Sequence, residues 1–199
     1  MTDDRSVLTN AAGTRDAVAI SLGQAFQNDP VFRWLLPDDD ARRAKLPKLF
    51  DLLFEIEQPI GDIRTSPAAE AASFWRPPGR AVTPFVEILK RALPLWGIFG
   101  FGLARMSAVT KAIEAHLPKD GAFWYAHFVG VRPDAQGRGW GGAMMRAGMA
   151  RAAADGLPVY LETARPENVS FYSGLGFEGL GEWDVPSGPR FWSMIRRVD

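Results

Sequence analysis

A short run of glycines constrains this sequence more than any other feature. Residues 136–142 read Gln-Gly-Arg-Gly-Trp-Gly-Gly and lie between a strand-like stretch, 123–131, and a helix-like stretch, 141–154. Glycine lets the backbone approach a ligand closely, and the first turn of a helix presents unpaired N–H groups and a positive dipole end. The loop therefore favours binding of a phosphate or pyrophosphate; the plainer alternative is a loop that uses glycine only to turn tightly.

The same glycines also fit a dinucleotide-binding fingerprint. Gly137, Gly139 and Gly142 have the required spacing, and Glu162 lies 20 positions after the last of them. In that fingerprint the strand runs almost directly into the first glycine, whereas residues 132–135 intervene here. Too little chain follows for the further parallel strands, and no Lys-Ser or Lys-Thr follows for a P-loop. A nucleotide-binding oxidoreductase therefore stays the less favoured alternative.

The hydrophobic pattern predicts a single α/β domain over residues 1–199, because no repeat or long linker divides the chain. Helical spacing of apolar residues predicts helices over 16–26, 40–57, 141–154 and 168–175. Apolar runs between turn residues predict strands over 61–64, 71–75, 123–131, 159–163, 178–184 and 190–198. The first helix should end at Asn28-Asp29-Pro30, and residues 83–117 are helical in pattern but broken at Pro94 and at 97–102.

Composition excludes several classes of protein. The 23 basic and 23 acidic side chains cancel, so no net charge draws the whole chain to nucleic acid or to an anionic membrane. The absence of cysteine excludes disulfides and thiolate sites, and two histidines give little support for a metal centre. The acidic start is unlike a secretory signal, and the longest uncharged apolar stretch, 94–104, is short of the ~20 residues of a membrane span. We expect a cytoplasmic protein with no metal, nucleic-acid or membrane partner.

Two motifs in the C-terminal half resemble a known family. Residues 129–141 are similar to the acetyl-CoA loop of the Gcn5-related N-acetyltransferases (GNAT), whose pattern Gln/Arg-x-x-Gly-x-Gly/Ala is matched by Gln136, Gly139 and Gly141. A second family element follows at 168–172, Asn-Val-Ser-Phe-Tyr. Within the family, residues 160–163 and 188–194 look most like puromycin N-acetyltransferase and its relatives. The resemblance is specific over residues 122–198 and only compatible before them.

The resemblance implies a mixed, mostly antiparallel central sheet flanked by helices, with a splayed strand pair at the acetyl-CoA site. Residues 121–180 would form the acetyl-CoA-binding core, and residues 58–118 the acceptor side. The positions that match the family's acetyl-CoA contacts are Val129, Val131, Gln136, Gly137, Arg138, Gly139, Trp140, Gly141, Gly142 and Asn168. The two valines would offer backbone groups to the pantetheine arm, the loop would hold the pyrophosphate, and the asparagine would steady the thiol end.

Three residues are candidates for catalysis. Tyr172 stands where the family often has a tyrosine that serves the departing CoA thiolate; the alternative is a core aromatic. An amine that arrives as an ammonium must lose a proton, and both His127 and Glu162 are candidate bases. Strand alternation is expected to place Tyr125, His127, Val129 and Val131 on one face of the sheet. A packed histidine and a structural glutamate are the alternatives, and His116 is expected only to cap the end of a helix.

The resulting functional hypothesis is direct transfer of acetyl from acetyl-CoA to a primary amine of a small molecule, since no cysteine is present to carry an acyl group. The acceptor would meet an apolar pocket lined by aromatic residues, unless these are ordinary core: Phe74, Trp75, Phe85, Trp96, Phe99 and Phe101. A second copy of the chain is a further candidate partner. The rival hypothesis is an acyl-CoA-binding sensor that lacks turnover.

Overall fold

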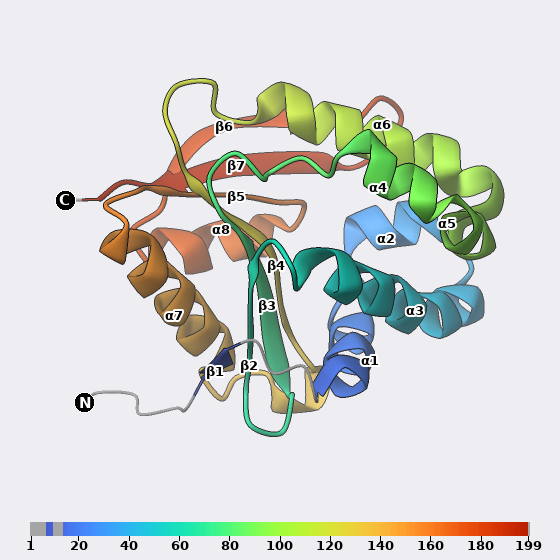
Figure 1. Cartoon of the computed structure of the whole chain (residues 1–199), viewed down its shortest axis with the longest axis horizontal. Helices are drawn as coiled ribbons and strands as arrows, with labels where there is room; N and C mark the ends of the chain where they lie inside the picture. Colours follow the sequence, from blue (N-terminus) through green and yellow to red (C-terminus); the bar gives the residue numbers. More distant parts are fainter. Residues whose placement is uncertain (1–6, 10–13, 199) are drawn as a thin grey trace.

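The computed structural model describes residues 7–9 and 14–198, which form one seven-stranded sheet with helices on both faces (Figure 1). The strands are β1 (Leu8–Thr9), β2 (Asp62–Thr65), β3 (Ala71–Arg76), β4 (Trp124–Val131), β5 (Val159–Thr163), β6 (Glu178–Asp184) and β7 (Arg190–Arg196). Their order across the sheet is β1-β2-β3-β4-β5-β7-β6. All neighbouring strands are antiparallel except β4 and β5, which are parallel.

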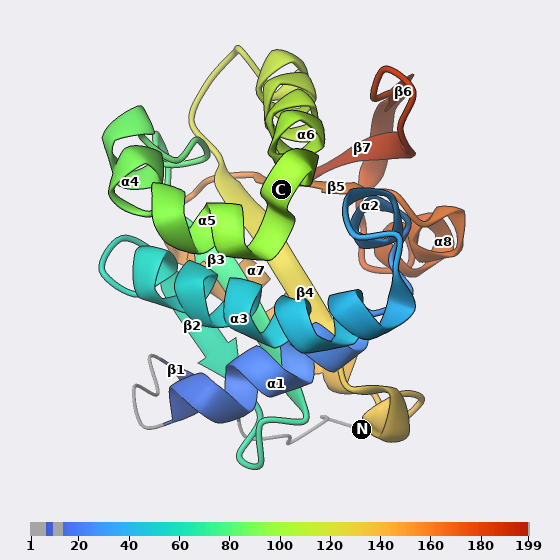
Figure 2. The ribbon, with the colours of Figure 1, turned by 90° about the vertical axis from the view of Figure 1, so that its right-hand side faces the viewer.

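The helices divide between the two faces of this sheet. They are α1 (Arg15–Ala25), α2 (Pro30–Leu35), α3 (Asp39–Glu57), α4 (Phe85–Lys90), α5 (Ala92–Phe99), α6 (Leu103–His116), α7 (Trp140–Ala154) and α8 (Pro166–Ser173), with 3-10 turns η2 (Gly100–Gly102) and η3 (Pro133–Ala135). Figure 2 shows α1, α3 and α5 layered over one face, with α4 beside α5. Helices α7 and α8 pack on the other face.

Each face of the sheet has its own hydrophobic core. Under α1 and α3, the ring of Phe128 on β4 lies 5.3 Å from Phe50 and 6.3 Å from Phe74, measured between ring centroids. Under α7, Met145 is fully buried with Trp75. The helices contribute their predicted apolar positions to the two cores. Burial of these apolar faces orients the helices against β3 and β4.

The structure confirms the expected mixed, mostly antiparallel sheet flanked by helices, and most predicted elements agree with it to within two residues. The main omission is α2. The Asn28-Asp29-Pro30 stop ends α1, but it also starts a new helix, because Asp29 accepts a hydrogen bond from Val31 N (2.9 Å) and Pro30 occupies the first turn. The break expected at Pro94 lies at Arg91, between α4 and α5, with Pro94 in the first turn of α5. The break expected at 97–102 is η2, where Gly100 has a φ of +52°.

His116 has the predicted capping role. It is the last residue of α6, and its Nδ1 donates to the carbonyl of Ala112 at 2.7 Å. Its ring also stacks on Trp183 of β6 with centroids 4.3 Å apart. These contacts tie the C-terminal end of α6 to the β6–β7 hairpin.

The parallel pair β4–β5 is splayed, as the resemblance implied. Only Trp124 and Tyr125 pair with β5, opposite Val159 and Tyr160. Strand β4 then continues to Val131 alongside β3 alone. A strand edge that lacks a neighbour offers N–H and C=O groups to whatever enters the gap.

The packing of α7 on the sheet requires a glycine at position 148. A Cβ there would lie 2.0 Å from Trp75 Cε2, and Trp75 is itself 1% exposed and has nowhere to move. We expect Gly148→Ala to lower the free energy of unfolding by about 1–3 kcal/mol, because overpacking outweighs the better helix propensity of alanine. Gly97→Ala in α5 is the matched control: its Cβ meets nothing within 4 Å, so chemical denaturation should report equal or higher stability. Equal stability of the two variants would contradict this account.

Candidate active site

A bulge in β4 decides which side chains face the site. The adjacent residues Phe74 and Trp75 of β3 pair with Phe128 and Ala126 of β4, so His127 is an extra residue in the strand. A bulge of this kind bends the strand and re-aims its side chains. The imidazole of His127 is thereby turned toward α3, where it bonds Glu57.

The bulge overturns the expected alternation along β4. Tyr125 and His127 do share a face, since their ring centroids lie 5.2 Å apart. Val129, however, packs in the core beneath α7, and Val131 Cγ2 lies 3.8 Å from the place that a Cβ on Gly141 would occupy. The prediction that all four share one face is therefore wrong, because one inserted residue reverses the pattern.

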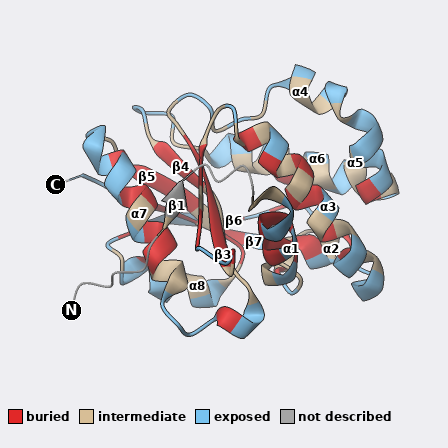
Figure 3. Ribbon diagram, turned by 60° about the horizontal axis from the view of Figure 1, so that its bottom comes forward, coloured by how far each residue is buried: buried red, intermediate tan, exposed pale blue. Residues whose placement is uncertain are grey.

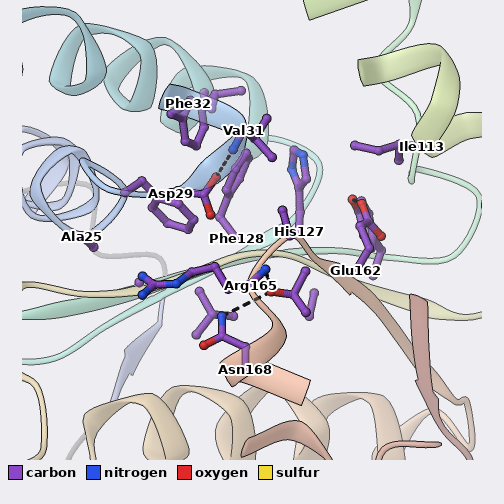
Figure 4. Close-up of a pocket in the computed structure, with 18 of the residues that line it drawn as sticks. Ala25, Asp29, Val31, Phe32, Ile113, His127, Phe128, Glu162, Arg165 and Asn168 are labelled. Carbon is purple, nitrogen blue, oxygen red and sulfur yellow. Dashed lines mark hydrogen bonds between the residues drawn. The ribbon is translucent and has the colours of Figure 1, made fainter. Parts of the chain in front are cut away.

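A single cavity of about 790 Å³ runs past both halves of β4 (Figure 4). One end is lined by the glycine loop and α8, and the other by apolar residues of α3, α5 and α6. The labelled side chains in Figure 4 come from α1, α2, α6, β4, β5 and α8 and converge on this space. The gap between the splayed strands thus opens into one cavity. We call the end at the glycine loop the backbone-rich end and the end at α3, α5 and α6 the apolar end.

The glycine loop forms the first of these ends. Gly137 and Gly139 have φ values of +72° and +82°, a region that other residues enter only with strain. Gln136 Nε2 donates to the carbonyl of Val131 at 3.1 Å and so closes the loop onto the end of β4. Arg138 is exposed and does not line the cavity. The loop residues that do line it are Gln136, Gly137, Gly139, Trp140, Gly141 and Gly142.

The centre of the site rests on a buried charge cluster that sequence reasoning missed. Glu57, at the end of α3, is fully buried and accepts from Arg76 Nε (2.8 Å) and Nη2 (2.6 Å). Its Oε1 also accepts from His127 Nδ1 at 2.8 Å. One signal in the sequence could have found it: Glu57 continues the apolar stripe of α3, seven residues after Phe50, so its carboxylate had to be buried and paired.

This cluster fixes the state of His127. Burial and the charge of Arg76 lower the pKa of His127 to about 4, although the charge of Glu57 and its hydrogen bond raise it. Burial alone would raise the pKa of Glu57, but its contacts with His127 and Arg76 outweigh burial and hold that pKa at about 2. Of these two partners, Arg76 is the permanent cation. At neutral pH the ring is therefore neutral, with its proton on Nδ1 and the Nε2 lone pair available on a cavity-lining side chain.

Glu162 is the second titratable group in the cavity. Tyr125 donates a hydrogen bond to its Oε1, whereas Oε2 is buried and has no hydrogen-bond partner among the described residues. Burial raises the pKa of Glu162 to about 7, even though the hydrogen bond from Tyr125 lowers it. A carboxylate with one unsatisfied oxygen in a cavity is suited to accept a proton or bind a cation.

The structure brings Asn168 and Tyr172 to the same cavity from α8. Asn168 Nδ2 donates to Thr163 Oγ1 at 3.3 Å, which holds the amide against the end of β5. The ring of Tyr172 packs 5.8 Å from Phe177, and burial raises the pKa of its hydroxyl to about 12. Tyr172 is thus both a core aromatic and a cavity residue, so its two expected roles are not exclusive.

Asp29 is a further cavity residue, for which the sequence pattern predicted only the end of a helix. Its carboxylate caps α2 and lies beside Phe32 and Phe128 in Figure 4. Burial raises the pKa of Asp29 to about 6, although the hydrogen bonds from the backbone of Val31 and Phe32 lower it. Its negative charge acts on the Tyr172 hydroxyl, which places the two groups near each other. The Asp-Pro pair that begins a helix was the available signal.

The aromatic residues expected to line the acceptor pocket are mostly elsewhere. Of the six, Phe99 lines the cavity. The two on β3 are buried in the cores. The remaining three are exposed on the opposite side of their segment: Phe85, Trp96 and Phe101. Aromatic side chains from other elements line the cavity instead: Phe26 directly after α1, Phe32 on α2 and Phe128 on β4.

The environment of Glu162 is open to direct measurement. A carboxyl ¹³C NMR titration should find one glutamate with a pKa of about 7, absent from Glu162→Gln. Tyr125→Phe keeps the ring but removes a hydrogen bond to the charged form, so the pKa of Glu162 should rise. A midpoint that is unchanged in Tyr125→Phe would show that this hydrogen bond does not set the titration.

Comparison with known proteins agrees with this geometry. Residues 98–179 match the sequence profile of the acetyltransferase (GNAT) domain. A crystal structure described as histone acetyltransferase HPA2 and related acetyltransferase, from Corynebacterium glutamicum, is 28% identical with a TM-score of 0.74 and covers 98% of this chain and 97% of that one.

Two further structures share the fold at lower identity. Polyamine N-acetyltransferase from Drosophila melanogaster is 13% identical with a TM-score of 0.60, over 97% of this chain and 100% of that one. Arylalkylamine N-acetyltransferase 2 from Aedes aegypti is 12% identical with a TM-score of 0.57, over 99% and 100%. The chain therefore has the fold of these acetyltransferases, and its residues 98–179 are similar to the GNAT acetyltransferase domain.

Proposed function

We propose that this protein transfers an acetyl group from acetyl-CoA to the primary amine of a small molecule that has an apolar body. One observation carries the proposal: the glycine loop and the unpaired edge of β4 open into the same cavity as Glu162 and Tyr172. A donor site and proton-handling groups in one chamber suit direct transfer between two bound substrates. The GNAT domain supports the same reaction class.

The residues at the backbone-rich end fit the donor. When bound, acetyl-CoA supplies an activated thioester; the chain's part is to hold it. The edge of β4 at Val129 and Val131, which has no strand partner toward β5, would take the pantetheine arm. The loop from Gly137 to Gly142 would take the pyrophosphate on its N–H groups, with Arg138 at the rim adding charge. Asn168 would hold the amide-bearing arm near its thiol end.

Glu162 is the better of the two candidate bases. A carboxylate whose conjugate acid has a pKa of about 7 accepts a proton near neutral pH more readily than an imidazole with a pKa of about 4. The free Oε2 faces no competing donor among the described residues. We assign proton removal from the amine to Glu162, and to His127 a hydrogen bond from its Nε2 lone pair that orients the amine or a water.

Tyr172 is assigned a hydrogen bond to the leaving thiolate rather than proton transfer. With its pKa raised to about 12, against ~8.5 for a thiol, full transfer is uphill by roughly 5 kcal/mol. A hydrogen bond that strengthens as negative charge develops avoids this cost. The buried ring fixes where the hydroxyl points.

The apolar end of the cavity indicates the acceptor class. Apolar side chains of Leu35, Leu53, Met106, Val109 and Ile113 line it, and the carboxylates in the lining of the whole cavity are Asp29, Glu114, Glu162 and Glu167. Such a lining suits a compound with one ammonium group on an aliphatic or aromatic body. A polyamine would have to desolvate further cations in a cavity whose lining also includes Arg76 and Arg91, which is costly. Puromycin is included among the candidates because residues 160–163 and 188–194 resemble that branch of the family.

Donor binding is tested by calorimetric titration with acetyl-CoA. We expect Gly139→Ala to weaken binding about tenfold or more, because a Cβ at φ +82° costs ~1–2 kcal/mol or displaces the loop. Gly79→Ala is the matched control: it has a similar φ of +75° but lies outside the cavity lining, so affinity should not change. Absence of acyl-CoA binding together with tight binding of NAD would favour the oxidoreductase alternative.

The acceptor is tested by measuring thiol release from acetyl-CoA with a panel of arylalkyl monoamines, alkyl monoamines, puromycin and polyamines. Apolar monoamines should give the highest kcat/KM. Turnover of any amine well above hydrolysis rejects the sensor hypothesis. Equal or better turnover of polyamines would contradict the proposed acceptor class.

Two substitutions separate the roles of the catalytic residues. Tyr172→Phe should lower kcat and kcat/KM together by roughly ten- to a thousandfold with acetyl-CoA affinity unchanged, because the hydrogen bond of the hydroxyl forms only as the thiolate develops. An unchanged kcat in Tyr172→Phe, where chemistry limits the rate, would leave the ring with a packing role only.

For the unaltered protein, kcat/KM should rise with pH through about 7, as the carboxyl of Glu162 loses its proton. Glu162→Gln should abolish this rise of kcat/KM with pH and lower the rate by about 10²–10⁴.

A further inference from the structure

An exposed apolar surface lies outside the wall of the acceptor cavity. We define the α4–α5 surface by the side chains of Val82, Phe85, Val86, Leu89, Leu93, Trp96 and Phe101. These are seven of the eleven large hydrophobic side chains that are exposed in the described part of the chain. All seven fall within the 20 residues from 82 to 101. Leu93 and Phe101 are 84% and 93% exposed. Figure 3 shows α4 and α5 at the edge of the molecule with most of their surface exposed or intermediate.

The fold does not need these side chains. The inward face of the same segment is complete without them, since Ile98 and Phe99 are buried in the core and Ile88 and Leu95 line the cavity. Helices of ordinary globular proteins have one apolar face, and here a second one faces outward. Exposed patches of this kind mark sites of protein or membrane contact.

The charge around the surface distinguishes between these partners. Residues 80–105 contain four basic side chains and one acidic one, a net charge of +3 in a chain whose net charge is zero. Arg80, Lys90 and Arg105 are exposed. The single carboxylate, Glu87, is half-buried and paired with Lys90 (2.8 Å) and Arg91 (2.6 Å). Lysine and arginine beside exposed Trp, Phe and Leu are the composition of segments that lie in the headgroup region of anionic membranes.

The geometry favours lying on a bilayer over spanning it. Among the described residues, Ala92–His116 is long and apolar enough to pass as a membrane span by length and composition. In the structure, however, η2 at Gly100–Gly102 separates α5 from α6, and α6 packs against the body of the protein through Val109 and His116. Trp96 and Phe101 remain together on the outside, 5.7 Å apart between ring centroids.

We propose that the α4–α5 surface docks on an anionic lipid bilayer, with Leu93, Trp96 and Phe101 inserted among the headgroups and the exposed Arg80 and Lys90 at the lipid phosphates. This differs from the expectation of no membrane partner, which rested on the zero net charge of the whole chain and on the lack of a long enough apolar stretch. Because the same helices wall the acceptor cavity, the docked protein holds that cavity next to the bilayer. The proposal is independent of the transferase activity.

The proposal is tested by sedimentation of the full chain with vesicles made of equal parts phosphatidylglycerol and phosphatidylcholine, and with vesicles of phosphatidylcholine alone. We expect binding to the anionic vesicles that weakens as salt rises, and at least about tenfold weaker binding to the neutral ones. The double variant Leu93→Glu/Phe101→Glu should lose binding while remaining folded, because both side chains are already exposed. Leu180→Glu, on an exposed position of β6, is the matched control and should bind like the unaltered protein.

Two results would overturn the proposal. One is failure of the unaltered protein to bind anionic vesicles at low salt. The other is a dimer in light scattering that Leu93→Glu/Phe101→Glu converts to a monomer, with vesicle binding unaffected; the surface would then be covered by a second copy of the chain. Blue-shifted tryptophan emission on vesicle addition, lost in Trp96→Phe, would support insertion of Trp96 itself.

Discussion

The buried ion pair between Glu57 and Arg76 is the contact on which the site depends. It joins the last residue of α3 to the last residue of β3, at the point where the acceptor-side helices meet the sheet. Arg76 also donates to the carbonyl of Ala81 and to Thr83 Oγ1, so the same guanidinium anchors the segment that leads into α4. Burying such a pair carries a large desolvation cost, and removal of either partner would strand a charge. What the chain gains is a defined position and protonation state for His127.

The proton-handling groups differ because their surroundings differ. Burial and the charge of Arg76 both lower the pKa of His127, whereas they oppose each other at Glu162, where burial raises the pKa and Arg76 lowers it. Asp29 and Tyr172 are likewise shifted toward their neutral forms by burial. The cavity lining thus contains both carboxylates and the cations Arg76, Arg91 and Arg165, and Glu162 is close to the midpoint of its titration at neutral pH.

The sequence predicted most of the strands, the two largest helices and the glycine loop, because these depend on local spacing and on the backbone freedom of glycine. The positive φ values at Gly137 and Gly139 are a local property that the presence of glycine at these positions already indicates. The contact of His127 with Glu57 is different, since it joins residues 70 positions apart and requires the bulge at His127. Period-two alternation contains no signal for one extra residue, so the prediction for Val129 and Val131 was wrong. Exposure of Trp96 and Phe101 also could not be predicted, because apolar residues in a helix are normally assigned to the core.

The bulge in β4 has a consequence for how such a protein can change over time. Because of the bulge, the consecutive residues His127 and Phe128 both face α3, and Val129 then packs under α7. Loss of one residue here would reverse the face of every position from the bulge to the glycine loop. This stretch of chain should therefore accept substitutions over time far more readily than changes of length.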